Sequence, residues 1–232
     1  MEEQRVDNWN KELARVIDHT ILKPDATEQD VRRICREACH YRFAAVVVPP
    51  SHVRVAVGET GGKGIRVCSV VSFPFGWDTT DHKLRQTEWL LKEGVDEIDV
   101  VMNISRFLSG DHAFVRAEAA EITALCGADV AVKWIIETAC LDESQIVLAA
   151  SLGADGGVRF IKTSTGCSHR GATVEDVRLI KSAVDARAGI KASGGIRTRA
   201  QAEALVRAGA TRLGCSASVD VVSAGAEGLP RS

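Results

Sequence analysis

The stretch from Phe160 to Gly166 reads FIKTSTG. Two β-favouring apolar residues run into a lysine, and three hydroxyl residues and a glycine follow. A strand that ends in this way carries the amine of Lys162 to the rim of a sheet and then turns. Residues 190–196 repeat the arrangement as IKASGGI, in which a short apolar run delivers Lys191 and a small-residue turn precedes a helical pattern. The two stretches predict neighbouring strands that both end in lysines.

The rest of the chain alternates short apolar runs with longer segments of helical pattern. This alternation predicts a parallel sheet, and eight strands are the number that closes into a (β/α)₈ barrel, here with a lead-in helix over residues 8–16. An open doubly wound sheet is the alternative. The apolar runs lie near residues 16–21, 44–48, 65–71, 97–101, 130–136, 158–161, 188–190 and 211–213. The helical segments cover residues 28–39, 82–93, 114–125, 143–152, 174–184 and 199–208.

Charged residues within the predicted strands favour the closed barrel over the open sheet. Such residues collect within or just after the strands, at Asp18, Asp99, Lys133, Lys162 and Lys191. The whole chain, residues 1–232, is expected to form one domain of this kind, with a mobile tail over about residues 223–232.

The helix boundaries carry their own signals. Thr27, Asp142 and Thr173 are expected N-caps, because acidic residues follow them in the first turn. Three glycines stand where C-caps are expected, at Gly94, Gly153 and Gly209. The glycine-rich stretch 58–64 (GETGGKG) lacks the spacing of a nucleotide-binding P-loop and is predicted to be a loop.

Two lysines at adjacent strand ends indicate amine chemistry. An ordinary lysine has a pKa near 10.4, so only about 0.1% is free base near neutral pH, whereas a pKa of about 7–8 makes tens of per cent available. Burial and a neighbouring ammonium both lower the pKa of an amine. We therefore expect Lys162 to form a Schiff base, and Lys191 to be the second ammonium that lowers its pKa and relays protons.

Asp99 lies in the predicted strand EIDVV, where Glu97 and Asp99 share one face and the apolar residues share the other. A carboxylate on the inner face of a barrel is unlikely to serve packing, so Asp99 is the expected catalytic partner of the lysines. Glu97 is expected nearer the bottom of the barrel, paired with a basic residue.

Backbone N–H groups near the end of the chain predict a phosphate-binding site. Gly194 and Gly195 precede the helix that begins near Thr198, and their main-chain N–H groups can approach an anion closely. Barrel enzymes often bind phosphate at the loops after the last two strands, where Ser216 lies here. Gly166 is expected to assist.

Composition excludes several other classes. The net charge of −2 gives no reason to expect a nucleic acid or an anionic membrane as partner, and no apolar run is long enough to span a bilayer. The charged N-terminus is not a secretory signal. The seven cysteines form no C-x-x-C, and the six histidines show no ligand spacing, so reduced cytosolic thiols and a metal-free, cofactor-free site are expected.

Six blocks in chain order resemble the deoxyribose-phosphate aldolase family. They are DHTILKP (18–24), SFPFG (72–76), DEIDVV (96–101), KWIIET (133–138), KTSTG (162–166) and KASGGIRT (191–198). The resemblance implies reversible cleavage of 2-deoxy-D-ribose 5-phosphate to acetaldehyde and D-glyceraldehyde 3-phosphate in deoxynucleoside catabolism. It also implies that Asp99 relays protons with Lys191. Further substrate-site residues implied by it are Asp18, Thr20, Phe73, Lys133 and Thr165.

The chain departs from the family pattern at four places. No cysteine occurs in the run 45–48, so a thiol near the site is expected to be missing. Residues 156–159 look inserted before the sixth strand, and Cys167 replaces a larger residue. Ala217 stands in place of a second serine after Ser216, which removes one hydroxyl from the expected phosphate site.

Several alternatives stay open at this point. Lys133 and Asp18 fit a structural ion network as well as a substrate site. Another Schiff-base aldolase, acting on a keto acid or another phosphorylated sugar, would need an arginine or extra polar groups near the lysine. Phe73 and Phe75 instead favour a partly apolar pocket suited to acetaldehyde. A non-catalytic phosphosugar-binding barrel is the third reading, and the oligomeric state, a homodimer or another, is not determined by the sequence.

Overall fold

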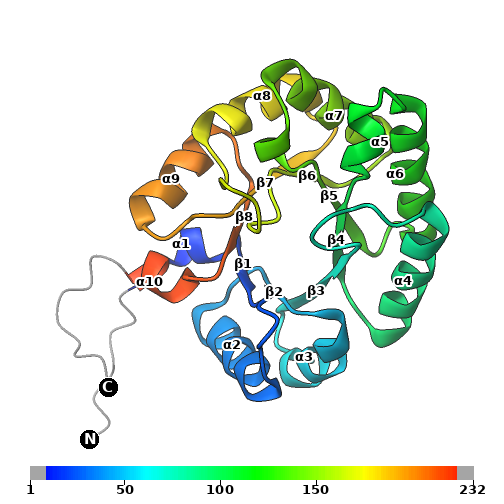
Figure 1. The fold of residues 1–232 in the computed structure, drawn as a ribbon. Helices are drawn as coiled ribbons and strands as arrows, with labels where there is room; N and C mark the ends of the chain where they lie inside the picture. The colour runs from blue at the N-terminus through cyan, green and yellow to red at the C-terminus, as the bar shows by residue number, and fades with distance from the viewer. Residues whose placement is uncertain (1–8, 224–232) are drawn as a thin grey trace, which may run out of the picture.

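A closed barrel of eight parallel strands forms the centre of the computed structural model, which describes residues 9–223 (Figure 1). Each strand pairs with the next in sequence order, and β8 pairs with β1 to close the barrel. The predicted (β/α)₈ barrel is confirmed, and the open doubly wound sheet is excluded. The strands are β1 (Ile17–Thr20), β2 (Ala45–Val47), β3 (Arg66–Val71), β4 (Glu97–Val101), β5 (Ala131–Ile135), β6 (Phe160–Lys162), β7 (Gly189–Ser193) and β8 (Arg212–Cys215).

Helices surround the barrel (Figure 1). The predicted lead-in helix is present as α1 but is shorter than expected, and it lies against the last described helix, α10. The α-helices are α1 (Lys11–Ala14), α2 (Glu28–Tyr41), α3 (Val53–Thr60), α4 (Thr80–Glu93), α5 (Ile104–Leu108), α6 (His112–Cys126), α7 (Glu143–Asp155), α8 (Val174–Val184), α9 (Arg199–Ala208) and α10 (Ser218–Ser223). Two short 3₁₀ helices, η1 (Pro50–His52) and η2 (Thr138–Cys140), follow β2 and β5.

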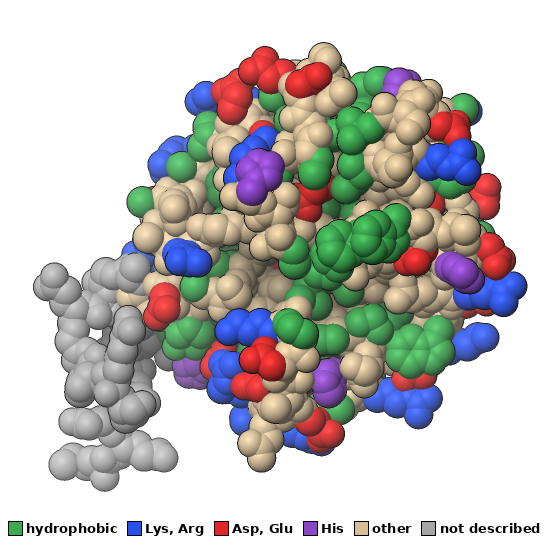
Figure 2. Space-filling model, in the orientation of Figure 1, with side chains coloured by type: hydrophobic (Ala, Val, Ile, Leu, Met, Phe, Trp, Pro, Cys, Tyr) green, Lys and Arg blue, Asp and Glu red, His purple; other side chains and the backbone are tan. Residues whose placement is uncertain are grey.

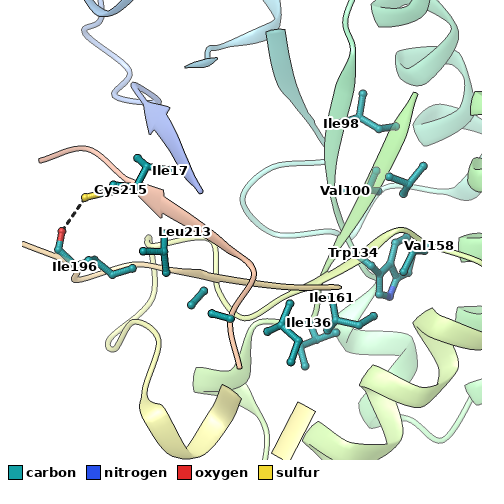
Figure 3. Close-up of a cluster of buried hydrophobic side chains, with 14 of the residues drawn as sticks. Ile17, Ile98, Val100, Trp134, Ile136, Val158, Ile161, Ile196, Leu213 and Cys215 are labelled. Atoms are coloured by element: carbon teal, nitrogen blue, oxygen red, sulfur yellow. Dashed lines mark hydrogen bonds between the residues drawn. The ribbon is translucent and has the colours of Figure 1, made fainter. Parts of the chain in front are cut away.

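The main hydrophobic core lies between the outer face of the barrel and the helices. Successive side chains of a strand point to opposite faces, so Ile98 and Val100 of β4 join this core while Glu97 and Asp99 face inward. Trp134 of β5 is its largest fully buried side chain and packs beside Ile161 of β6 (Figure 3). The outer face therefore carries the packing, which leaves the inner face free for charged residues.

The predicted helix starts are confirmed. Thr27, Asp142 and Thr173 each form a capping box, in which side chain and backbone exchange hydrogen bonds across the first turn. Gly94 ends α4 in the left-handed conformation and Gly209 ends α9, as expected.

The predicted C-cap at Gly153 is wrong, because α7 continues to Asp155. A side chain at Gly153 would place its Cβ 2.8 Å from Ile161 Cδ1 and 2.9 Å from Trp134 Cδ1. The glycine is therefore required for close packing of α7 on the barrel rather than for ending the helix.

Residues 156–159 form the connection between α7 and β6 and do not disturb the sixth strand. Phe160 pairs with Gly189, and Lys162 pairs with Lys191, in the regular parallel register. Lys162 therefore stands beside Lys191 as the motifs predict. The expectation that both strands end in lysines holds for β6 but is wrong for β7, which continues to Ser193.

Two other expectations concern loops. The predicted loop over residues 58–64 is wrong in part, since Gly58 to Thr60 form the last turn of α3 and the turn covers residues 61–64. Ser223 closes α10, and the rest of the predicted mobile tail, residues 224–232, lies outside the described residues. Within residues 9–223 no helix is long and apolar enough to cross a membrane.

Candidate active site

Three residues predicted to be catalytic meet inside the barrel around one carboxylate oxygen. Lys162 Nζ lies 2.7 Å from Asp99 Oδ2, and Lys191 Nζ lies 2.7 Å from the same oxygen. All three side chains are buried. The register explains the meeting, because Lys162 and Lys191 are paired residues of adjacent strands and Asp99 projects inward from β4.

Lys133 and Asp18 lie in the same network. Lys133 Nζ contacts Asp99 Oδ1 at 2.8 Å and Glu97 Oε2 at 2.7 Å, and Asp18 Oδ2 contacts Lys191 Nζ at 2.6 Å. Arg212 of β8 joins Asp18 at 2.7 Å to Glu97 at 2.9 Å. Glu97 thus pairs with basic residues, as the sequence predicted. Lys133 contacts three carboxylates and Asp18 contacts three cations, which favours the ion-network reading for both.

The surroundings shift the pKa values of Lys162 and Lys191 in opposite directions. Burial lowers the pKa of Lys162, and the Lys191 ammonium lowers it further, whereas Asp99 acts in the opposite direction and only in part offsets them. Burial also disfavours charge on Lys191, but Asp18 and Asp99 outweigh it and raise the pKa of that amine. The second lysine contributes to the depressed pKa as expected, but burial is the larger cause.

Asp99 and Lys133 are held in their charged forms. Burial alone would raise the pKa of Asp99, but the three lysine ammonium groups hold it well below its usual range. Burial would lower the pKa of Lys133, and the Asp99, Asp18 and Glu97 carboxylates raise it well above the usual value.

The count of buried charges identifies the amine that can lose its proton. Among the described residues, Lys162 contacts one carboxylate, Lys191 contacts two and Lys133 contacts three. Arg66 also reaches Glu97, but its side chain is mostly exposed to solvent. The buried network has one more cation than carboxylates, so a neutral Lys162 would balance it. Its members are Asp18, Glu97, Asp99, Lys133, Lys162, Lys191 and Arg212.

The expected absence of a thiol is wrong. Cys68 of β3 donates its S–H to Asp99 Oδ1 at 3.2 Å, and Lys133 Nζ donates to its sulfur at 3.1 Å. Burial raises the pKa of this thiol far above its ordinary value, so it is held neutral. The period of β3 is the sequence signal for this thiol, because it puts Cys68 on the same inward face as Val70.

One side of the barrel interior is apolar. Val47, Cys68 and Val70 form a separate buried cluster with Leu22 and Phe73 against it, and the Phe73 ring centre lies 6.0 Å from Lys162 Nζ. This position agrees with the expectation of an apolar pocket.

Phe75 lies elsewhere than its motif suggests. Phe75 is 56% exposed and stacks on the exposed Trp77, so it does not line the interior. Hydrophobic side chains gather near the centre of this face of the molecule, over the loop between β3 and α4 (Figure 2). Thr20 is half-buried, and its hydroxyl donates to the backbone oxygen of Asp18.

The predicted phosphate-binding glycines lie together at the ends of β6 and β7. Gly166, Gly194 and Gly195 all have positive φ values, of 88°, 88° and 76°. A Cβ on Gly194 would lie 3.3 Å from Gly166 Cα and 3.0 Å from the Cα of Gly171. Gly171, which has no local sequence signal for this role, packs directly against this backbone. The helix α9 begins only at Arg199, so Gly194 and Gly195 form a turn before it rather than its first turn.

The two other predicted residues of this end flank the glycines. Thr165 is half-buried, and its backbone N–H and its hydroxyl both donate to Glu137 Oε2. Ser216 is exposed directly after β8. Gly214 of β8 gives room for the catalytic group, because a Cβ there would lie 3.1 Å from Lys191 Cε.

Known proteins resemble this chain over nearly its whole length. The family model described as DeoC/LacD family aldolase matches residues 13–226. The chain is 42% identical over 216 residues to a deoxyribose-phosphate aldolase of Bacillus mycoides, which covers 93% of this chain and 97% of that protein. It is 41% identical over 210 residues to the enzyme of the same name from Bacillus cytotoxicus, over 90% of this chain and 94% of that one.

Solved structures show the same similarity. A putative deoxyribose-phosphate aldolase from Coccidioides immitis superposes with a TM-score of 0.88 at 34% identity, over 91% of this chain and 84% of that one. The deoxyribose phosphate aldolase from Aeropyrum pernix, described as tetrameric, superposes with a TM-score of 0.87 at 34% identity, over 94% and 92% of the two chains.

Proposed function

The chain belongs to the DeoC/LacD family of aldolases, and we propose that it reversibly cleaves 2-deoxy-D-ribose 5-phosphate through a Schiff base on Lys162. The products are acetaldehyde and D-glyceraldehyde 3-phosphate, and the reaction serves deoxynucleoside catabolism in the cytoplasm. The observation that carries the proposal is the buried amine of Lys162, which shares Asp99 Oδ2 with Lys191 and has a lowered pKa.

The neutral amine of Lys162 is the nucleophile. It attacks the C1 aldehyde carbon of the sugar, and the carbinolamine loses water to give an iminium. The C3 hydroxyl then gives its proton to a base as the C2–C3 bond breaks, so that D-glyceraldehyde 3-phosphate leaves and the bond electrons form an enamine. Protonation of the enamine at C2 and hydrolysis of the iminium release acetaldehyde and restore Lys162.

Asp99 and Lys191 move the protons in this scheme. Asp99 is ionised and touches both amines, so it can accept a proton at one step and return it at another. Lys191 remains an ammonium, supported by Asp18, and is a proton donor 2.7 Å from this carboxylate. Lys133 and Asp18 act by fixing the charges of Asp99 and Lys191.

The phosphate is held at the open end by backbone and one hydroxyl. Gly166, Gly194, Gly195 and Ser216 supply the proposed contacts, and Ala217 cannot supply the second hydroxyl. The positive φ values of the three glycines support this role, because turns of this kind direct successive N–H groups toward an anion. The carbonyl end of the substrate then lies near Lys162, beside the apolar side chain of Phe73.

A keto-acid aldolase is less well supported. Such an enzyme would need a cation for the substrate carboxylate, and the arginine of the barrel interior, Arg212, is occupied by Asp18 and Glu97. A barrel that only binds a phosphosugar would not need a buried amine with a lowered pKa, such as that of Lys162. Self-association, as a homodimer or another assembly, remains part of the proposal; the Aeropyrum pernix relative is described as a tetramer.

Borohydride trapping tests the reaction class. Reduction in the presence of acetaldehyde should convert the imine into a stable amine and add one ethyl group to the peptide that contains Lys162, which peptide mass mapping would locate. An adduct on another lysine, or none in an active preparation, would refute the assignment.

Substituting Gly171 tests the phosphate end. The Cβ of an alanine would lie 2.1 Å from Gly194 O, so the loop must move and displace the proposed phosphate-binding turn. We expect Gly171→Ala to raise KM for 2-deoxy-D-ribose 5-phosphate by about tenfold or more and to lower stability by about 1–3 kcal/mol, the usual cost of overpacking. Steady-state kinetics and thermal unfolding measure the two effects.

Gly58 provides the matched control. It lies in α3, and a Cβ added there would have no other atom within 4 Å, so Gly58→Ala should keep KM unchanged and stabilise the helix by up to about 1 kcal/mol. An unchanged KM in Gly171→Ala would contradict the proposed place of the phosphate.

A further inference from the structure

Glu137 is a buried carboxylate at the mouth of the barrel that the proposed reaction does not use. It follows β5 directly after Ile136, is 4% exposed and has φ = +52° and ψ = +69°. A residue with a side chain rarely adopts this left-handed conformation, and such outliers persist where the surrounding structure holds them, often at functional sites. The strained backbone and the burial of Glu137 together indicate that its carboxylate has a specific role.

Within the described residues, the Glu137 carboxylate forms hydrogen bonds with one residue, Thr165. Glu137 Oε2 accepts the Thr165 backbone N–H at 3.2 Å and also the Thr165 hydroxyl. Glu137 Oε1 is shielded from solvent and has no hydrogen-bond partner among residues 9–223. Hence every hydrogen bond that this side chain makes within the described structure fixes Thr165.

The hydrogen bonds of the Thr165 hydroxyl determine whether it can donate to a ligand or accept from one. A threonine hydroxyl has one proton and two lone pairs. Its proton is given to Glu137, and one lone pair accepts the backbone N–H of Cys167 at 3.0 Å. One lone pair is left, so the half-buried hydroxyl can accept one further hydrogen bond but cannot donate one.

We propose that Glu137 is a positioning residue that fixes the Thr165 hydroxyl as a hydrogen-bond acceptor for a substrate hydroxyl. The pair thereby selects an acceptor aldehyde that carries a hydroxyl group next to its carbonyl carbon. The inference rests on the proposed function, which supplies the orientation of the substrate between Lys162 and the glycine turn.

The place of Thr165 in the loop indicates which hydroxyl it meets. It stands between Lys162, the proposed point of attachment of C1, and Gly166, at the proposed phosphate end. A five-carbon chain held at C1 and at its 5-phosphate presents its inner carbons to the residue between these two points. The C3 oxygen must exchange a proton during cleavage, which leaves the C4 hydroxyl, the 2-hydroxyl of D-glyceraldehyde 3-phosphate, as the group that donates to Thr165.

Aldol addition with two acceptors tests this selection. Acetaldehyde is the donor, and the acceptors are D-glyceraldehyde 3-phosphate and 3-oxopropyl phosphate, freshly released from its acetal, which lacks only the 2-hydroxyl. The wild type should favour the hydroxylated acceptor in kcat/KM. Glu137→Ala should lower that preference about tenfold, the size expected for one lost hydrogen bond in a shielded site.

Two further variants separate positioning from a general structural effect. Thr165→Val should lower the preference as much as Glu137→Ala does, and the double variant should lower it no further. Glu137→Gln should restore most of the preference, because its amide oxygen can accept both hydrogen bonds of Thr165. A loss of folding alone would lower both rates together and leave their ratio unchanged.

Borohydride trapping with acetaldehyde distinguishes the possible failures. An ethyl adduct on Lys162 in every variant, together with an unchanged preference in Glu137→Ala, would overturn the role of Glu137 and leave the proposed reaction standing. Additive losses in the double variant would equally overturn a role through Thr165. Absence of the adduct in the wild type would overturn the proposed reaction and this inference with it.

Discussion

Replacing Lys162 with methionine is expected to reduce kcat for cleavage of 2-deoxy-D-ribose 5-phosphate by about 10⁴-fold or more. Methionine has a side chain of similar length but no amine, so neither the iminium nor the enamine can form. Loss of a covalent nucleophile removes a whole reaction path rather than one interaction, and losses of about 10⁴–10⁶-fold are typical of such substitutions. A coupled assay of D-glyceraldehyde 3-phosphate release measures the effect.

The charge balance of the barrel makes this variant informative, because it should remain folded. Without Lys162 the buried network keeps three cations and three carboxylates, and Asp99 keeps contacts with Lys133 and Lys191. The Tm should therefore equal or exceed that of the wild type. Cys68→Ala is a suitable control, because it removes a neutral thiol from the same carboxylate and should keep kcat within about tenfold. Activity of Lys162→Met within about 100-fold of the wild type would contradict the Schiff-base role.

The parts of this fold that are predictable from sequence are those with a local signal. The position of Asp99 follows from the period of its strand, because apolar residues at Ile98 and Val100 fix which face turns inward. The starts of α2, α7 and α8 follow from capping residues that act within one turn. In each case the physical cause lies within a few residues of its effect.

Other features depend on contacts between distant segments and have no such signal. Gly153 looks like a helix end, but the space left for it by Trp134 and Ile161 determines why it is glycine. Gly171 is required because of the Gly194 carbonyl, which belongs to another loop. The Glu137 conformation is tied to Thr165 across two strand ends. None of these requirements can be read from the residues adjacent in sequence.

The charge network combines a feature that has a local sequence signal with one that depends on contacts between distant segments. Glu97 was expected to pair with a basic residue because its strand points it inward. That partner, Arg212, comes from the last strand, and it meets Glu97 only because the barrel closes. The same closure decides that Asp18 supports Lys191, which makes Lys191 the better compensated of the two paired lysines.

Lys191→Leu is expected to reduce activity near neutral pH by about 100-fold or more and to recover part of it at alkaline pH. Removal of this ammonium takes away one of the causes that lower the pKa of Lys162, and Asp99, which raises that pKa, loses a competing partner. Both changes move the pKa of Lys162 upward. The fraction of free amine at neutral pH falls, and it increases about tenfold for each pH unit until the new pKa is reached.

The pH profile of kcat/KM, with KM for the phosphorylated sugar followed separately, distinguishes tuning from proton transfer. Lys191→Arg is the matched variant: arginine keeps the positive charge beside Asp18 and Asp99 but does not release a proton in this range. If tuning dominates, Lys191→Leu recovers with rising pH and Lys191→Arg retains much of its activity at neutral pH. If Lys191 transfers protons directly, both variants stay inactive from neutral to strongly alkaline pH while folded and able to bind phosphate. Near-normal activity of Lys191→Leu at neutral pH would reject both roles, because a fully buried ammonium 2.7 Å from the catalytic carboxylate would then contribute nothing to the reaction.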